Sequence, residues 1–208
     1  MIAYGVRQVL AVLLALAAGA PVLSDGADAS LLQHQRISGS MVHRSSSMYQ
    51  VPDIGVVRED GRKVNIRAEL EGGGPVLVGF VFTTCTAICP LTSATFRQIQ
   101  DRLGPHEPLL IASISIDPER DTPARLRTYA HQFGAGPNWH HYTGSQAASQ
   151  ALQRAFDAYR GDKMEHTAVA FLRMAPGRPW VRIDGFASAD EWLAQYRSKA
   201  EPAALASR

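Results

Sequence analysis

The feature that most constrains the fold is an almost unbroken apolar run, Val76–Phe82, followed closely by two cysteines and a proline. A continuous apolar run of this length is typical of a central strand that is buried on both faces of a sheet. Proline is favoured at the first position of a helix, so we expect a helix to begin at Pro90 and to end at Gly104. Cys85 and Cys89 therefore lie where a buried strand passes into a helix, with Cys89 at the helix N-cap.

The rest of the chain alternates between strand and helix patterns. We expect strands at Ile54–Val57, Val64–Ile66, Leu109–Ile116, Trp139–Tyr142, Thr167–Leu172 and Trp180–Ile183, and helices that begin at Thr122, Ser145 and Ser188. The first two strands flank Asp60 and Gly61, a turn pair that predicts an N-terminal β-hairpin. Strands that alternate with helices predict a mixed α/β sheet flanked by helices on both faces. Right-handed crossovers put the cysteine loop at the carboxyl edge of this sheet, where ligands gather.

The chain divides into four segments, of which the first has the pattern of an export signal. In residues 1–24, Arg7 is the only charge and precedes the apolar run Val9–Leu23, as in a signal peptide; the alternative is a retained N-terminal anchor. Residues 25–50 are polar and lack periodicity, so we expect a flexible leader. Residues 51–199 form the predicted domain, and residues 200–208 a frayed tail. We expect the mature protein in the periplasm, tethered to the inner membrane if the signal is not cleaved.

Charge and cysteine content exclude several classes of function. The 21 basic and 19 acidic residues give a net charge of +2, which does not favour binding to nucleic acid. The two cysteines are too few for a disulfide framework. Their close spacing, in a threonine-rich loop ahead of a proline, indicates a redox pair or a soft-metal site. The alternative is that both are buried and only pack.

Two chemistries fit a cysteine pair at the start of a helix. The helix N-terminus stabilises a thiolate, and we expect Cys89, nearer to the helix dipole, to have the lowered pKa. A dithiol can cycle to a disulfide, and two thiolates can also bind a soft metal ion such as copper. Dithiol oxidoreductases favour two residues between the cysteines, whereas this chain has three. The wider spacing favours metal.

Histidine supplies the remaining candidate ligands. His140 and His141 are adjacent on a predicted strand, so their side chains point to opposite faces and cannot both reach one metal ion. His166 lies between the polar stretch Gly161–Glu165 and a predicted strand. Its loop can approach the cysteine loop across the end of the sheet, although a solvated loop histidine is the alternative.

Four motifs together resemble the SCO/SenC family of thioredoxin-like copper-binding proteins, over about Val51–Tyr196. The motifs are Cys85–Pro90, Ser115–Pro123, the pair Thr143-Gly144, and His166-Thr167. The resemblance implies a thioredoxin-like domain that binds copper, as Cu(I) or Cu(II). It also implies that the ligands are Cys85, Cys89 and His166.

The resemblance further implies a metallochaperone that assists assembly of the dinuclear copper centre in subunit II of cytochrome c oxidase. Another exported copper protein is an alternative client, and we expect the protein to act as a monomer. Some members of the family resemble thiol–disulfide oxidoreductases that reduce the cysteines of that subunit, so Cys85 and Cys89 are also a candidate catalytic, redox-active pair. A peroxidase-like thiol enzyme is a third reading, suggested by the fold class alone.

The chain departs from the family pattern beside the histidine. Glu165 stands where the family usually has aspartate, and it can orient the imidazole by hydrogen bonding. Met164 offers a soft thioether as a weak extra ligand, or it is only a loop or packing methionine. For the acidic turn Asp117–Asp121 we expect a structural role, held by local pairs and by the cap of the next helix.

Overall fold

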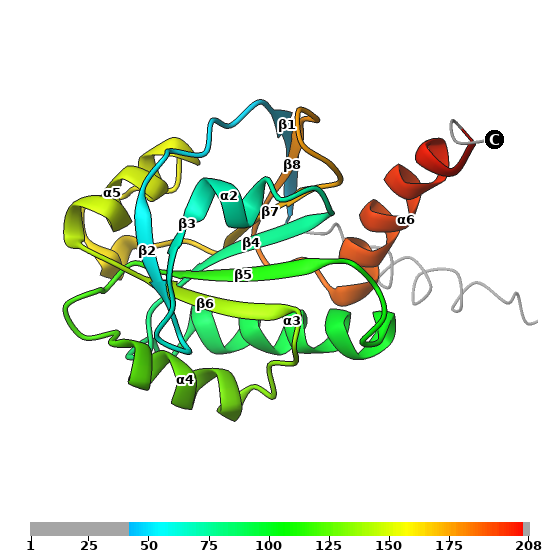
Figure 1. The fold of residues 1–208 in the computed structure, drawn as a ribbon. Coiled ribbons are helices and arrows are strands. Elements are labelled where there is room, and N and C mark those ends of the chain that lie inside the picture. Colours follow the sequence, from blue (N-terminus) through cyan, green and yellow to red (C-terminus); the bar gives the residue numbers. More distant parts are fainter. Residues whose placement is uncertain (1–41, 206–208) are drawn as a thin grey trace, which may run out of the picture. The chain divides into compact units, whose positions relative to one another are not determined.

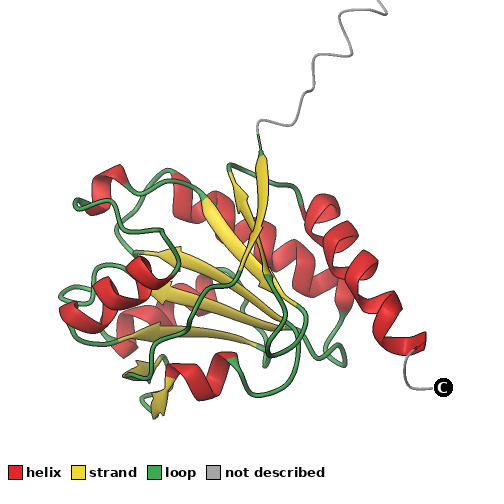
Figure 2. Ribbon diagram, turned by 90° about the horizontal axis from the view of Figure 1, so that it is seen from above, coloured by secondary structure: helices red, strands yellow, loops and turns green. Residues whose placement is uncertain are grey.

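The structure, a computed structural model, describes residues 42–205, and the side chains as far as residue 198. The expected signal at 1–24 and most of the expected leader at 25–50 lie outside this range. The described residues form one eight-stranded sheet with helices on both sides (Figures 1 and 2). Within them, no helix is long and apolar enough to cross a membrane.

The sheet is mixed, as the sequence predicts, and its strands run in the order β1-β8-β7-β4-β5-β6-β2-β3. The central strands β4, β5 and β6 are parallel, and all other neighbours are antiparallel. The strands are β1 (His43–Ser47), β2 (Gly55–Arg58), β3 (Lys63–Asn65), β4 (Val76–Val81), β5 (Leu110–Ser115), β6 (Trp139–Thr143), β7 (Val169–Arg173) and β8 (Trp180–Asp184). The expected N-terminal hairpin is the antiparallel pair β2–β3.

One strand and one helix of the structure were not expected. Strand β1 lies inside the segment expected to be a flexible leader, where it pairs with β8 at one edge of the sheet. Its serine-rich sequence has little strand propensity, so the pairing with β8 determines its conformation. A short helix, α2 (Ile66–Leu70), was not expected. The Asn65 side chain caps it by accepting the N–H of Ala68, and both of its terminal residues are buried.

The other helices occur where the sequence predicts them, except that α3 begins two residues before Pro90 and α6 continues through residues 200–205, which were expected to belong to a frayed tail. They are α3 (Ile88–Leu103), α4 (Pro123–Gln132), α5 (Gln146–Ala155) and α6 (Ala189–Leu205), with a 3₁₀ turn η2 (Lys163–Glu165). Thr122 and Ser145 cap α4 and α5 as expected. Ser188 and Glu191 form the expected capping box, because each side chain accepts the backbone N–H of the other.

The core has one apolar layer on each face of the sheet. Val78 and Phe80 of β4 pack in a cluster with residues of α2 and α5. Leu77 packs on the opposite face with residues of α3 and α6. A Cβ atom at Gly79 would meet the ring of Phe96 at 2.8 Å, so glycine at this point lets α3 approach β4 closely. This approach fixes the helix at whose start the cysteines lie.

Candidate functional site

The cysteine loop runs from the end of β4 to the start of α3, at the carboxyl edge of the sheet. Cys85 is half-buried in the loop, and its N–H donates to the carbonyl of Phe82 at 3.1 Å. Cys89 is fully buried, and its N–H donates to the Sγ of Cys85 at 3.4 Å. Both thiols are free. The four-residue spacing thus brings the first cysteine back over the start of the helix.

The two thiols have opposite pKa shifts. Burial disfavours the Cys85 thiolate, but hydrogen bonds from the backbone N–H groups of Cys89, Ala87 and Ile88 outweigh it, and the pKa of Cys85 is lowered. Burial raises the pKa of Cys89, and the neighbouring Cys85 raises it further.

The expectation that Cys89 is the activated thiol is therefore wrong. Helix α3 begins at Ile88, two residues before the expected start, so Cys89 lies inside the first turn and not at the N-cap. The free N–H groups of that turn point at the sulfur of Cys85, which consequently takes the stabilisation that a helix start offers to a negative charge.

Asp121 holds the entry to the cysteine loop. Its carboxylate is fully buried and accepts the hydroxyl of Thr83 at 2.6 Å, the backbone N–H of Thr83 at 3.2 Å, and the hydroxyl of Ser115 at 2.6 Å. The expected local contacts are present, because the carbonyl of Asp117 accepts the N–H groups of Arg120 and Asp121 and Thr122 caps α4. The carboxylate of Asp121 in addition joins the ends of β4 and β5. The aspartate comes just before the helix cap Thr122, and nothing in that pattern indicated a distant partner.

His166 follows η2 and lies close to the end of β4. The pairing of Gly79 with Ala170 puts the start of β7 beside the end of β4, and the His166 ring lies 6.4 Å from the ring of Phe80. The histidine is 5% exposed, so it is not a solvated loop residue. Burial lowers the pKa of His166 to about 4, which leaves a neutral imidazole at physiological pH.

The structure brings together some of the predicted site residues and not others. Among residues 42–205, no three His, Cys, Asp or Glu side chains form a ready group for a metal ion. Cys85 and Cys89 are in contact, whereas His166 lies at the same edge of the sheet without completing a cluster with them. Glu165 is exposed, and within the described chain its carboxylate makes no hydrogen bond to His166. Met164 is 74% exposed.

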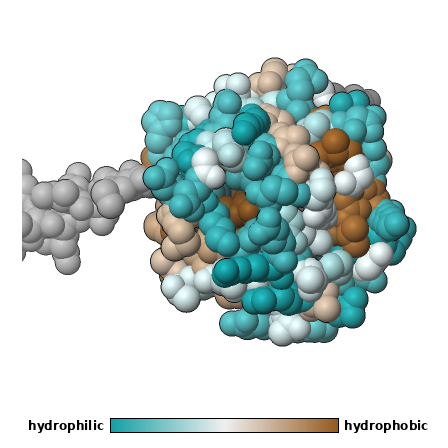
Figure 3. Space-filling model, turned by 90° about the vertical axis from the view of Figure 1, so that its left-hand side faces the viewer, coloured by the Kyte–Doolittle hydropathy of each residue, from teal (hydrophilic) through white to brown (hydrophobic). Residues whose placement is uncertain are grey.

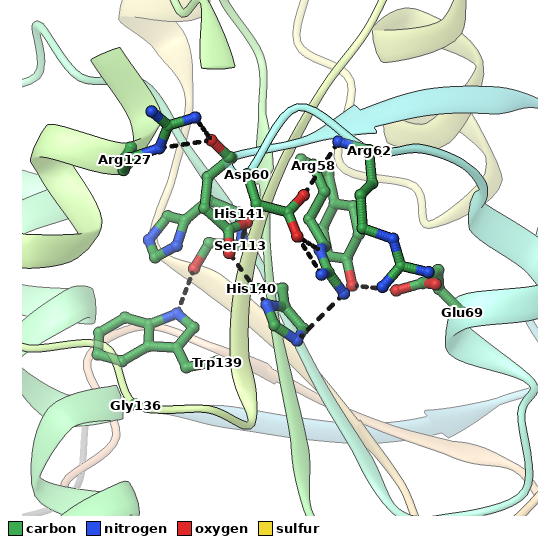
Figure 4. Close-up of polar contacts among 12 residues, drawn as sticks. Arg58, Asp60, Arg62, Glu69, Ser113, Arg127, Gly136, Trp139, His140 and His141 are labelled. Atoms are coloured by element: carbon green, nitrogen blue, oxygen red, sulfur yellow. Dashed lines mark hydrogen bonds and ion pairs between the residues drawn. The ribbon is translucent and has the colours of Figure 1, made fainter. Parts of the chain in front are cut away.

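His140 and His141 belong to a different cluster, where β2 pairs with β6 (Figure 4). The Glu59 carboxylate contacts Nδ1 of His140 at 3.0 Å and accepts the backbone N–H of His141 at 2.8 Å. The ring of His141 is buried and stacks on Trp139 at 5.4 Å. Burial lowers the pKa of His141 to about 4. The two rings have different surroundings, as their adjacent places on a strand predict.

Comparison with known proteins decides the family. The family model described as SCO1/SenC matches residues 53–201, most of the folded domain and all of the candidate site. The chain belongs to the SCO1/SenC family. The resemblance inferred from the four motifs is thereby confirmed.

Two solved SCO-family structures share the fold. BsSco, described as a member of the Sco family of cytochrome c oxidase assembly proteins with a disulfide switch, has 27% sequence identity and a TM-score of 0.62 over 74% of this chain and 95% of that one. Arabidopsis thaliana ScoI, solved with copper bound, has 23% identity and a TM-score of 0.61, over 73% of this chain and 98% of that one. The expected thioredoxin-like fold is confirmed.

Curated relatives match over shorter stretches. A SCO1 protein homolog of Bacillus subtilis is 33% identical over 98 residues, which are 46% of this chain and 50% of that protein. A protein of Stutzerimonas stutzeri, whose name proposes that it binds copper, is 37% identical over 78 residues, 36% of this chain and 37% of that one. The chain thus spans about half the length of these relatives, or less.

Proposed function

We propose that this protein binds one copper ion through Cys85, Cys89 and His166 and delivers it as a metallochaperone. The client is the dinuclear copper centre of cytochrome c oxidase subunit II or another exported copper protein. The observation that carries the proposal is the contact of the two cysteines, at 3.4 Å between Cys89 N and Cys85 Sγ, beside a buried histidine at the same sheet edge. Membership of the SCO1/SenC family supports it.

The donor set suits a soft ion. Two thiolates and one neutral imidazole favour Cu(I), and Cu(II) accepts the same donors with an additional ligand. Cys85 has a lowered pKa and is prepared to bind, whereas Cys89 must lose its proton when the ion arrives. Because His166 does not complete a cluster with the thiols, we expect copper to draw its segment and the cysteine loop together.

The second candidate function is thiol–disulfide exchange with an exported copper protein. The opposite pKa shifts favour it, because a half-exposed thiolate at Cys85 beside a protonated, buried Cys89 matches an attacking thiol and a resolving thiol. The Cys85 thiolate attacks a client disulfide and forms a mixed disulfide. Cys89 then gives up its proton, forms the Cys85–Cys89 bond, and releases the client as a dithiol.

An anaerobic titration of the reduced protein with Cu(I), against a competing chelator, separates these functions. Tight one-to-one binding that is lost in Cys85→Ala, Cys89→Ala and His166→Ala is the result that the copper proposal requires. Weak binding that does not change in His166→Ala contradicts it and leaves dithiol exchange. In that case, a Cys85–Cys89 reduction potential suited to exchange is the expected finding.

A further inference from the structure

Residues 162–166 form the histidine segment, whose backbone is joined by hydrogen bonds within one turn. Asp162 caps η2 by accepting the N–H of Met164 at 2.9 Å. The N–H of His166 in turn donates to the carbonyl of Lys163 at 3.2 Å. The backbone at Lys163 and the backbone at His166 are therefore linked within one short turn, so whatever holds Lys163 in place also sets the point from which the imidazole projects.

The side chain of Lys163 reaches out of this segment to the end of β5. Its ammonium group lies 2.5 Å from the carboxylate of Asp117. It also lies 5.9 Å from the ring centre of Phe82, three residues before Cys85. One cation thus contacts the residues that follow both central strands, including the one that leads into the cysteine loop.

The environment of Asp117 makes this contact more than a surface pair. The aspartate side chain is only 7% exposed, whereas that of Lys163 is 29% exposed. A carboxylate removed from water needs a countercharge, and a single pairing partner is correspondingly hard to replace. Asp117 itself is fixed, because its N–H donates to the hydroxyl of Ser115 and its carbonyl accepts the N–H groups of Arg120 and Asp121.

The surface around the pair leaves the segment otherwise open. A groove of about 420 Å³ lies between the histidine segment and the end of β5, with Asp117, Tyr159 and Lys163 among its lining residues. The face at the left of Figure 1 is mostly hydrophilic, with a hollow that has an apolar floor (Figure 3). His166 itself is buried, but Lys163 is half-buried and Met164 and Glu165 are exposed, so the 3₁₀ turn has little apolar packing and the ion pair has more influence on its position.

We propose that Lys163 is a positioning residue for the metal site. Its ion pair with Asp117 holds the histidine segment against the ends of β4 and β5. The inference rests on the proposed copper site. When the ion pair is formed, the imidazole stays at the sheet edge that carries the cysteine loop, where copper can recruit it as the third ligand, and copper is retained. When the ion pair is broken, the segment moves more freely and copper is bound by the two thiolates alone.

The test is Lys163→Met, which keeps the apolar stem and removes the charge, in the same Cu(I) competition titration. The expected result is a fall in copper affinity of about 10- to 100-fold, the range for a removed residue that orients a metal ligand. Lys63→Met, a change at an exposed lysine of β3, is the matched control and should bind as the wild type does. Asp117→Asn breaks the same ion pair, and it replaces Lys163→Met in the titration if that variant does not fold.

A double-variant cycle separates positioning from a general loss of structure. In a His166→Ala background, Lys163→Met should lower copper affinity no further, because the ligand that it positions is gone. An equal fall in both backgrounds, or wild-type affinity in the single variant, overturns the inference while the copper proposal stands. Wild-type protein that does not bind Cu(I) tightly overturns the copper proposal and this inference together.

Discussion

The cysteine loop and the histidine segment are both parts of the candidate site, and they are built in different ways. The cysteines are four residues apart, and a buried carboxylate, Asp121, clamps the loop that carries them. His166 comes from a distant part of the chain and follows a turn with exposed residues, whose Lys163 pairs with Asp117 after the end of β5. One half of the site is preformed, and the other is adjustable. The proposed copper delivery requires a site that both holds and releases an ion, and this division is suited to it.

The largest effect on stability is expected at Asp121, which holds the preformed cysteine loop. Asp121→Ala leaves the hydroxyl groups of Thr83 and Ser115 and the N–H of Thr83 without their acceptor. We expect a loss of about 3–5 kcal/mol in the free energy of unfolding, because hydrogen bonds to a buried charge are lost together. Urea unfolding measures it. A loss below about 1 kcal/mol would show that Asp121 is not the clamp.

The second prediction concerns His166, through which the free energy of unfolding should depend on pH. The pKa of His166 is about 4 in the fold and about 6.5 for an unperturbed histidine, so the unfolded state binds more protons between these values. Stability is then full above about pH 6.5 and falls as the pH drops toward 4. The free energy of unfolding falls by at most about 3 kcal/mol over this range.

His166→Ala should flatten this part of the pH profile in urea unfolding at pH 7 and pH 5. His131→Ala, which removes an exposed histidine of α4, is the control and should leave the profile as it is. His141 adds a similar dependence of its own and is unaffected by either change. An unchanged slope in His166→Ala would mean that this ring is not buried in solution.

A smaller effect is expected where α3 meets the sheet beneath the cysteines. Gly79→Ala puts a Cβ atom 2.8 Å from the ring of Phe96, so α3 must shift away from β4. Overpacking of this kind costs about 1–3 kcal/mol in thermal or urea unfolding. Because the shift moves the helix start, the rate of alkylation of Cys85 should change as well. Wild-type stability together with a wild-type rate would contradict the packing argument.

The smallest effect is expected at Met164. Its side chain is 74% exposed, so Met164→Leu should change the free energy of unfolding by less than about 0.5 kcal/mol. Copper affinity should also stay close to that of the wild type, whereas Lys163→Met lowers it. A marked loss of copper affinity in Met164→Leu would show that the thioether is a ligand.

Local patterns in the sequence predicted much of this structure. The apolar run of β4, the β2–β3 hairpin and the caps at Thr122, Ser145 and Ser188 each depend on neighbouring residues, and all were confirmed. The cysteine loop was predicted for the same reason. Its helix start was misplaced by two residues, and that small shift exchanged the roles of the two thiols.

Non-local contacts could not be predicted in the same way. The burial of His166 follows from the register of β7 on β4, and the clamp at Asp121 from the meeting of two strand ends. Strand β1 exists because β8 offers it a partner. The ion pair of Lys163 with Asp117 joins residues that are 46 positions apart. Each depends on tertiary structure, which residue patterns alone do not specify.

The most direct test of the central claim is X-ray absorption spectroscopy at the copper edge of the reduced, Cu(I)-loaded protein. The account predicts a copper ion bound by two sulfur donors and one imidazole nitrogen, with the nitrogen absent in His166→Ala. A spectrum with sulfur donors only, unchanged by His166→Ala, would contradict the three-ligand site. It would also leave the buried histidine with a structural role alone.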